Sequence, residues 1–276
     1  MDPLDVVLLV VGGLFAGCVN TMAGGGSLLT VPLLVLAGVP GDVANGSNRV
    51  GILASNVSAM VTFRRLRVSG VSRALPVLVP LVAGSLTGSL LVSQLAAETF
   101  ERAFGVVMVP LLVLSLRPPK VGAAARHWSP TTAGIVFFGV GCYGGAFQAG
   151  IGLLLVLALS RSGLDLVLAN GIKVVVILVV TVTALSVFIA RDLVDWAPAL
   201  VLAAGFAAGG GLGARFTVAG GARAVRPVIA VAVLAMSGRL IGVYRARTRR
   251  GAPDRTAGTL ICTTQSSGLG ESPDRR

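Results

Sequence analysis

The chain consists of long apolar runs separated by short charged segments, and this pattern predicts membrane-spanning helices. Residues 6–41, 74–97 and 127–160 carry no formal charge when the single histidine is neutral. A spanning helix needs about 20 apolar residues, so the middle run fits one helix. The other two runs are too long for one helix and too short for two comfortable ones. We therefore predict an all-α polytopic membrane protein.

Glycine clusters interrupt both of the longer runs. The first contains Gly24-Gly25-Gly26-Ser27, and the third contains Gly150-Ile151-Gly152. Each run is interpreted as a helix, a glycine break and a shorter apolar segment, at 27–38 and 152–163. Such breaks are tolerated at membrane depth only where they are buried in protein or line a cavity. The pattern leaves open whether the short segments cross the membrane or re-enter it.

Further spans are predicted from the remaining apolar stretches. They cover approximately residues 45–63, 74–93, 102–117, 167–189, 196–214 and 226–243. With one full span from each broken run, we expect about eight transmembrane helices.

The two halves of the chain match each other when the sequence is shifted by 125 residues. The informative matches are a triplet and three glycines: Ala44-Asn45-Gly46 on Ala169-Asn170-Gly171, Gly25 on Gly150, Gly84 on Gly209 and Gly88 on Gly213. We predict two tandem repeats, each with a glycine-broken segment. They would cover 1–117 and 130–244, with a cytoplasmic linker at 118–129 and a disordered basic tail at 245–276.

Composition narrows the class of protein further. Hydrophobic residues make up 54% of the chain and charged residues only 12%, which excludes a soluble domain and a disordered chain. The net charge of +12 lies mainly in loops and tail, as expected for membrane topology rather than for nucleic-acid binding. The arginines of 64–73 and the basic residues of 117–127 indicate cytoplasmic loops. Charge counting does not choose between parallel and inverted repeats.

Chemistry that needs clustered ligands is not expected. The three cysteines are far apart in the sequence and His127 is the single histidine. Zinc, iron–sulfur and Ser-His-Asp chemistry therefore lack their usual residue sets. We expect no metal, no cofactor and no enzymatic activity.

A repeat of several helices with a broken segment in each half is typical of a secondary transporter that binds its solute near the membrane midplane. Arg49 and Lys173 lie inside predicted spans, shortly after the repeated Asn-Gly. Charges in spans usually face a cavity or a partner, so two cations predict an anion site. The alternative is that both side chains snorkel to the headgroups or pair with Asp42 and Asp165.

Other residues are candidates to complete the anion site. Backbone amides would come from the glycine breaks, namely Gly24, Gly25, Gly26, Ser27, Gly150 and Gly152; the alternative for these glycines is close helix packing. Side-chain hydrogen bonds would come from Asn20, Asn45, Asn48, Gln148 and Asn170, for which the alternative is a purely interhelical role. For the paired glycines Gly84, Gly88, Gly209 and Gly213 we expect close packing.

The residues around the first glycine break resemble a known family. The run Ala23-Gly24-Gly25-Gly26-Ser27-Leu28-Leu29-Thr30-Val31-Pro32, followed by Gly38-Val39-Pro40, is similar to the TauE/SafE sulfite-exporter family of membrane permeases. The resemblance implies a bacterial inner-membrane transporter of sulfite, thiosulfate or organosulfonates. The second half departs from the motif, because Ile151 breaks the triple glycine and Leu157 stands where Pro32 would repeat.

We therefore expect a secondary transporter, an exporter or permease, for a small sulfur-containing anion in the bacterial plasma membrane. One repeat would rock against the other in alternating access. The alternatives are an anion channel and a non-transporting membrane partner protein. The expected partners are the anionic solute and the lipid bilayer but no nucleic acid, and a homo-oligomer is left open.

Overall fold

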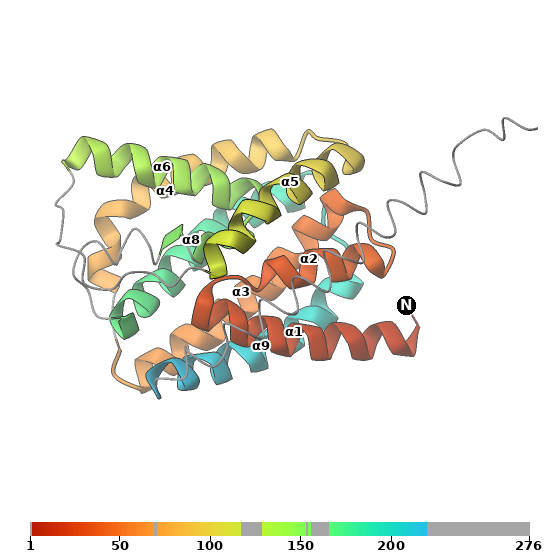
Figure 1. Cartoon of the computed structure of the whole chain (residues 1–276), viewed down its shortest axis with the longest axis horizontal. Helices are drawn as coiled ribbons and strands as arrows, with labels where there is room; N and C mark the ends of the chain where they lie inside the picture. Colours follow the sequence, from red (N-terminus) through yellow and green to blue (C-terminus); the bar gives the residue numbers. More distant parts are fainter. Residues whose placement is uncertain (1, 69–70, 117–128, 153, 156–165, 220–276) are drawn as a thin grey trace, which may run out of the picture. The chain divides into compact units, whose positions relative to one another are not determined.

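The computed structural model describes residues 2–68, 71–116, 129–152, 154–155 and 166–219, and all regular structure in these ranges is helical (Figure 1). Most of the predicted segment 152–163, the linker, the predicted span 226–243 and the tail lie outside them. The helices are α1 (Pro3–Ala23), α2 (Ser27–Leu36), α3 (Gly41–Arg65), α4 (Val71–Val92), α5 (Ala97–Leu116), α6 (Pro130–Ala146), α8 (Leu166–Ala190) and α9 (Trp196–Val218).

The first glycine break forms where it was predicted. Helix α1 ends because Gly24 adopts a left-handed conformation (φ 78°), and its N–H donates to the carbonyl of Asn20 at 2.8 Å. A glycine adopts this conformation without the steric cost that a Cβ atom brings. Helix α2 then begins at Ser27 after only three residues. The chain therefore reverses direction within the glycine run.

Helix α2 runs back along α1 rather than continuing its course. A Cβ atom placed on Gly26, just before α2, would touch the carbonyl oxygen of Ala16 at 2.5 Å. Farther along α2, the side chain of Leu33 lies 2.6 Å from the Cβ position of Gly12. Sequence numbers rise in one helix as they fall in the other, so α1 and α2 form an antiparallel helical hairpin with the glycine break at its tip.

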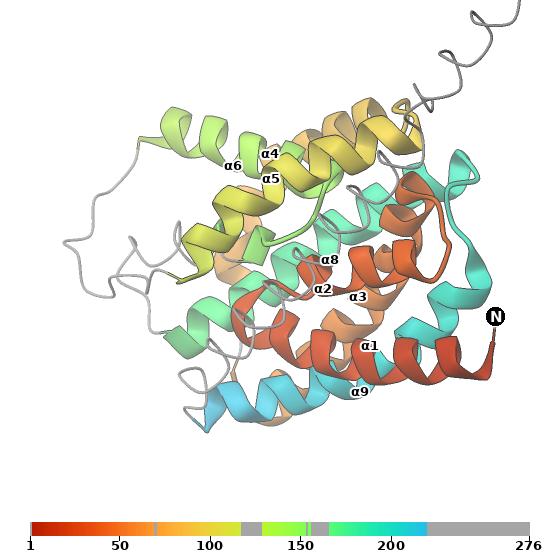
Figure 2. The ribbon, with the colours of Figure 1, turned by 45° about the vertical axis from the view of Figure 1, so that its right-hand side comes forward.

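The most extensive helix contacts join opposite halves of the chain. Helix α1 packs against α9, and α6 packs against α4 (Figures 1 and 2). Paired glycines permit the close approach: a Cβ atom on Gly209 would overlap the backbone of Leu14, and one on Gly88 would overlap the backbone of Cys142. The predicted packing role of these glycines is confirmed. Helix α3 also packs against α1 and α9, and α8 packs against α4 and α6. The six helices therefore form two three-helix groups, one of α1, α3 and α9 and the other of α4, α6 and α8.

The helices within a group run in the same direction, whereas the two groups oppose each other. On α9, the Cβ position of Gly205 meets the carbonyl of Val10 on α1, and that of Gly213 meets the carbonyl of Cys18. Residue numbers rise together along the two helices, so α1 and α9 are parallel. The central helices α3 and α8 are antiparallel. The start of α3, at Gly46, meets the Leu193 carbonyl beyond the end of α8, and the residue Val68 beyond α3 meets Gly171 near the start of α8.

Three described helices are long and apolar enough to cross a membrane, namely α1, α8 and α9 over Pro3–Met22, Val167–Ala190 and Trp196–Val218. Large apolar side chains on α1, α4 and α9 face outward, as expected where lipid covers the surface. Helix α3 is also long, but its buried face carries polar residues such as Asn45, Asn48, Arg49 and Asn56. Because α3 is packed among other helices, protein rather than lipid surrounds that polar face.

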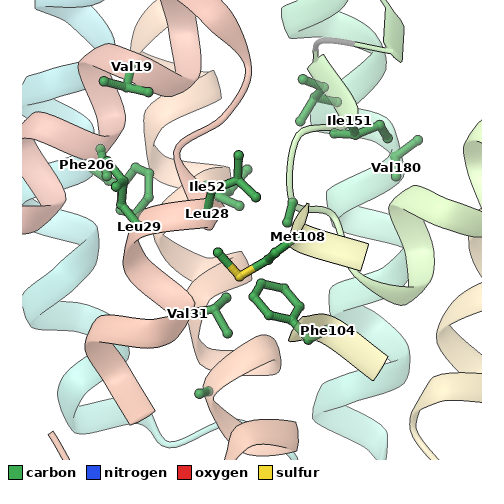
Figure 3. Close-up of a cluster of buried hydrophobic side chains, with 14 of the residues drawn as sticks. Val19, Leu28, Leu29, Val31, Ile52, Phe104, Met108, Ile151, Val180 and Phe206 are labelled. Atoms are coloured by element: carbon green, nitrogen blue, oxygen red, sulfur yellow. The ribbon is translucent and has the colours of Figure 1, made fainter. Parts of the chain in front are cut away.

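Buried apolar side chains pack around α2, the second arm of the hairpin (Figure 3). Leu28, Leu29 and Val31 of α2 contribute to this core, and Phe104 and Met108 of α5 lie beside them. The core therefore surrounds the hairpin tip and excludes bulk solvent from it.

Candidate functional site

The two glycine breaks, which are far apart in the sequence, meet at one point. A Cβ atom on Gly24 would overlap the backbone of Gly152, and a Cβ atom on Gly152 would overlap the backbone of Gly24. Two peptide backbones approach this closely only where neither residue has a side chain. Lys173 lies beside this crossing, with its Cδ 3.1 Å from the Cβ position of Gly152.

Arg49 of α3 binds the C-terminal end of α6. One terminal nitrogen of its guanidinium donates to the Gly144 carbonyl at 3.1 Å and to Oε1 of Gln148 at 2.6 Å. The other donates to the carbonyls of Gly145 and Ala146. The ring of Phe188 covers the guanidinium, with Cζ 4.5 Å from the ring centroid.

Lys173 of α8 binds the C-terminal end of α1 in a corresponding way. Its Nζ donates to the Thr21 carbonyl at 2.7 Å and, at 3.5 Å, to that of Asn20. It also donates to Oδ1 of Asn170, one turn earlier in α8, at 2.6 Å. Each cation thus comes from the central helix of one group and binds the end of the first helix of the other group.

The surroundings of the cations decide between the alternatives left by the sequence. Arg49 and Lys173 have 0% of their surface exposed, so neither side chain snorkels outward. Among the described residues the single ion pair joins Arg102 to Glu98, so Asp42 pairs with neither cation; Asp165 lies outside the described residues. The last carbonyls of a helix carry roughly half a negative charge. These carbonyls stabilise each cation without cancelling its charge.

Most of the predicted amide side chains lie around these two cations. Asn45 donates to the Ala146 carbonyl at 2.8 Å, beside Arg49. Gln148 lies in the second glycine break and has a positive φ of 58°. Its side-chain amide donates to the hydroxyl of Thr181, while its Oε1 accepts from Arg49. The hydroxyl of Thr30 donates to Oδ1 of Asn48. These residues, with Asn20 at the end of α1, form a buried polar layer that α1, α2, α3, α6 and α8 contribute to.

Several buried polar atoms in this layer have no hydrogen-bond partner. They include Nδ2 of Asn20, Nδ2 of Asn48 and Nε of Arg49, which are all donors. A buried donor without a partner costs about 1–3 kcal/mol. The layer therefore has unused donors, which a ligand with acceptor oxygens would satisfy, and one unused acceptor, Oδ1 of Asn45.

The glycine-break residues divide into those at the crossing and those in ordinary packing. Gly24 and Gly152 lie at the crossing, and Gly150, two residues before Gly152, has a positive φ of 70°. Gly26 packs tightly on α1, as the packing alternative predicts, whereas the Cβ position of Gly25 contacts only Leu28 at 3.5 Å. Ser27 is buried in the first turn of α2, where the amides of a helix N-terminus favour an anion.

Several residues of the site were not among the predicted ones. Thr30 binds Asn48, Thr181 binds Gln148 and Phe188 covers Arg49, and none was among the residues proposed for the site. The carbonyls at the ends of α1 and α6 are backbone groups, which a sequence pattern does not reveal. In the described part of the chain, no three His, Cys, Asp or Glu side chains gather as a metal site would require.

Comparisons with known proteins found one matching family and several relatives. A sequence profile described as "Sulfite exporter TauE/SafE" matches residues 9–240. The "Probable membrane transporter protein YfcA" of Escherichia coli (strain K12) is 26% identical over 245 residues, which cover 87% of this chain and 91% of that protein. A "Probable membrane transporter protein" of Haemophilus influenzae is 25% identical over 248 residues, 87% of this chain and 95% of its own length. No solved structure matches the chain.

Proposed function

Because the chain belongs to the sulfite exporter TauE/SafE family, we propose that it is a secondary transporter of a small sulfur-containing anion, such as sulfite or an organosulfonate. It would act as an exporter or permease across the inner membrane of a bacterium. Its membrane-transporter character follows from the family and from the relatives. The choice of solute, the direction and the multi-pass inner-membrane location are our proposal.

One observation carries the proposal: two fully buried cations bind the helix ends that lead into two crossing glycine breaks. Buried charge is costly and is retained in membrane proteins mainly along solute pathways. Broken helices at such a point expose backbone groups to a solute. We assign substrate binding to Arg49 and Lys173 with the amides and glycines around them.

We further propose that the two sequence repeats, 1–117 and 130–244, have inverted topology within a protein of about eight spans. The antiparallel course of α3 and α8 supports this, since they occupy matching positions in the two repeats. The matching contacts of α1 with α9 and of α6 with α4 also support it. In this arrangement the hairpin segment 27–38 is re-entrant, and 118–129 and 245–276 remain the linker and the tail.

The moving bodies in transport would be the two three-helix groups rather than the two sequence repeats. Helices within a group pack through glycine contacts between backbones, whereas the groups meet along α3 and α8 and at the hairpin tip. Rocking about that interface would open the site to one side of the membrane at a time. The membrane potential would drive anion export, with about 2.3 kcal/mol per charge per 100 mV.

The test is flux in proteoliposomes across a panel of sulfite, thiosulfate, sulfoacetate, taurine, sulfate and phosphate. We expect saturable flux of at least one sulfur-containing anion, stimulated by counter-solute. Arg49→Gln and Lys173→Gln should reduce that flux. Conductance of single-channel size would instead favour an anion channel. Normal flux in both variants, with both correctly folded, would overturn the assigned site.

A further inference from the structure

The central helices α3 and α8 end in the same kind of turn, at 66–68 and 191–195. Arg67 after α3 and Asp192 after α8 both adopt a left-handed conformation, with φ of 58° and 54°. In each turn the next N–H, that of Val68 or Leu193, donates at 2.9 Å to the carbonyl of the phenylalanine five residues earlier. This is the Schellman pattern of helix ends. Corresponding residues are separated by the repeat shift (192 minus 67 is 125), so the turns are equivalent elements of the two repeats.

Each turn lies against the central helix of the other repeat, at the glycine of the repeated Asn-Gly. Leu193 after α8 meets Gly46 of α3, and Val68 after α3 meets Gly171 of α8. Because α3 and α8 are antiparallel, the two contacts lie at opposite ends of this helix pair. The asparagines of the dipeptide belong to the proposed solute site, whereas its glycines receive the turns at both ends of the interface between the three-helix groups.

The two ends differ in how closely the turn approaches the helix. A Cβ atom on Gly46 would overlap a backbone carbonyl oxygen of the turn after α8. Next to it, the hydroxyl of Ser47 accepts a hydrogen bond from the Asp195 N–H at 2.8 Å. A Cβ atom on Gly171 would meet only a methyl carbon of Val68, at 3.2 Å. The end at Gly46 is therefore closed backbone to backbone, whereas the end at Gly171 is in contact only through a side chain.

This arrangement requires a glycine at position 46 but not at position 171. A methyl group on Gly171 would be accommodated by a shift of a few tenths of an ångström at Val68. A glycine inside a helix is less favourable than an alanine, and the present contacts do not compensate for it. A mirror arrangement, in which turn 66–68 closes on α8 as turn 191–195 closes on α3, would use Gly171 as Gly46 is used here.

The closed end also contacts a buried cation of the solute site. Cδ1 of Phe188 lies 3.0 Å from the Cβ position of Gly46, and the same ring covers the guanidinium of Arg49. The equivalent residues at the other end are Phe63 and Val174, which pack in one apolar cluster. Opening the end at Gly46 would therefore move the ring that covers Arg49.

On the basis of the proposed function, we infer that the two turns are the gates of the solute pathway and that this structure has the outer gate closed. Turn 66–68 follows Arg64 and Arg65 and is the cytoplasmic gate, because arginine-rich segments face the cytoplasm. Turn 191–195 is then the outer gate. Rocking of α3 against α8 closes one end as it opens the other. Gly46 permits the close approach in the outer-closed state, and Gly171 permits it in the inner-closed state.

The experiment measures how fast a buried cysteine at each gate reacts with an impermeant maleimide. Ser47→Cys reports the outer gate in right-side-out membrane vesicles. Ile172→Cys, at the equivalent position of the second repeat, reports the inner gate in inside-out vesicles. Ser47 and Ile172 have 0% and 1% of their surface exposed, so labelling requires an opening. Each reporter is placed in the full-length chain after removal of its native cysteines, and is labelled with and without a glycine substitution.

The two glycine variants should act in opposite directions. Gly46→Ala prevents full closure of the outer gate, so Ser47→Cys should be labelled roughly 5- to 150-fold faster and Ile172→Cys more slowly. Gly171→Ala hinders the inner-closed state, so it should slow the labelling of Ser47→Cys and speed that of Ile172→Cys. Gly105→Ala in α5 is the matched control, because the Cβ position of this helical glycine has nothing within 4 Å; it should change neither rate.

A cross-link keeps the test decisive if Gly46→Ala does not fold. Ser47→Cys combined with Asp195→Cys places two thiols at a contact of the closed outer gate. Oxidation should stop the flux of the panel anion that the wild type carries, and reduction should restore it. Failure of the pair to cross-link, or undiminished flux in the cross-linked protein, would overturn the inference.

The outcomes separate the gates from the proposed function, because maleimide labelling needs no solute. Opposite shifts of the two reporters without flux of any panel anion would support the gates and overturn the proposed solute. Flux of a panel anion, together with a labelling rate of Ser47→Cys that Gly46→Ala leaves unchanged, would overturn the gates alone. So would a shift of both reporters in the same direction, which indicates a general loss of packing.

Discussion

Replacing Gly152 by alanine tests the crossing of the two glycine breaks directly. The added Cβ atom would overlap the backbone of Gly24, and it would lie 3.2 Å from the Gly24 carbonyl oxygen and 3.1 Å from Cδ of Lys173. Lys173 is flexible enough to shift by a few tenths of an ångström, but the backbone of Gly24 is not. The two breaks must therefore separate.

The cost follows from this geometry. Overpacking a well-filled interior by one methyl group typically costs about 1–3 kcal/mol. For a chain of this size, 1 kcal/mol corresponds to roughly 2–4 °C in Tm. We therefore expect Gly152→Ala to lower Tm by about 2–12 °C. We also expect it to reduce flux, because separation of the breaks changes the position of Lys173.

The assay is thermal unfolding in a mild detergent, followed by flux in proteoliposomes at a temperature where the variant is folded. Gly139→Ala is the matched control, since the Cβ position of Gly139 in α6 has nothing within 4 Å. Alanine is a better helix former than glycine by about 1 kcal/mol, so this control should be as stable as the wild type or more stable. Equal stability and equal flux of Gly152→Ala and the wild type would refute the crossing.

Three other outcomes follow from the packing and from the charge pattern. Gly88→Ala should lower stability by about 1–3 kcal/mol, measured by thermal unfolding, because its Cβ would overlap the backbone of Cys142; unchanged Tm would contradict the close α4–α6 contact. Phe188→Leu should cost about 0.5–2 kcal/mol from the lost cation–π contact with Arg49, whereas no loss would show that the ring does not stabilise the guanidinium. In a background without the native cysteines, Arg67→Cys should be protected from an impermeant maleimide added outside the cell, and Gln94→Cys should be labelled. The reverse result would show that the loop after α3 lies outside the cell, opposite to its expected cytoplasmic side.

Much of the helical framework could be predicted from the sequence, because apolar runs and glycine clusters are local signals. Helix α1 ends at the predicted break, and the predicted spans 45–63 and 196–214 lie inside α3 and α9. The packing glycines Gly88 and Gly209 were predicted from their spacing and their place in the repeat. Local signals of this kind depend on the chain's own periodicity and not on its tertiary contacts.

Gln148 and Asn170, predicted as site residues, do bind the cations, but the backbone partners could not be predicted in the same way. Arg49 binds carbonyls about a hundred positions away in the sequence, and a backbone carbonyl has no residue type. The packing of α1 on α9 depends on how the two halves assemble, which charge counting did not resolve.

The most direct test of the account is counterflow of radiolabelled sulfite and organosulfonates into proteoliposomes preloaded with the same unlabelled anion. A carrier with its site at the hairpin tip predicts transient accumulation of label above equilibrium for at least one of these anions, and little accumulation with Asn48→Leu. The account is contradicted if no sulfur-containing anion accumulates, or if Asn48→Leu accumulates label as well as the wild type.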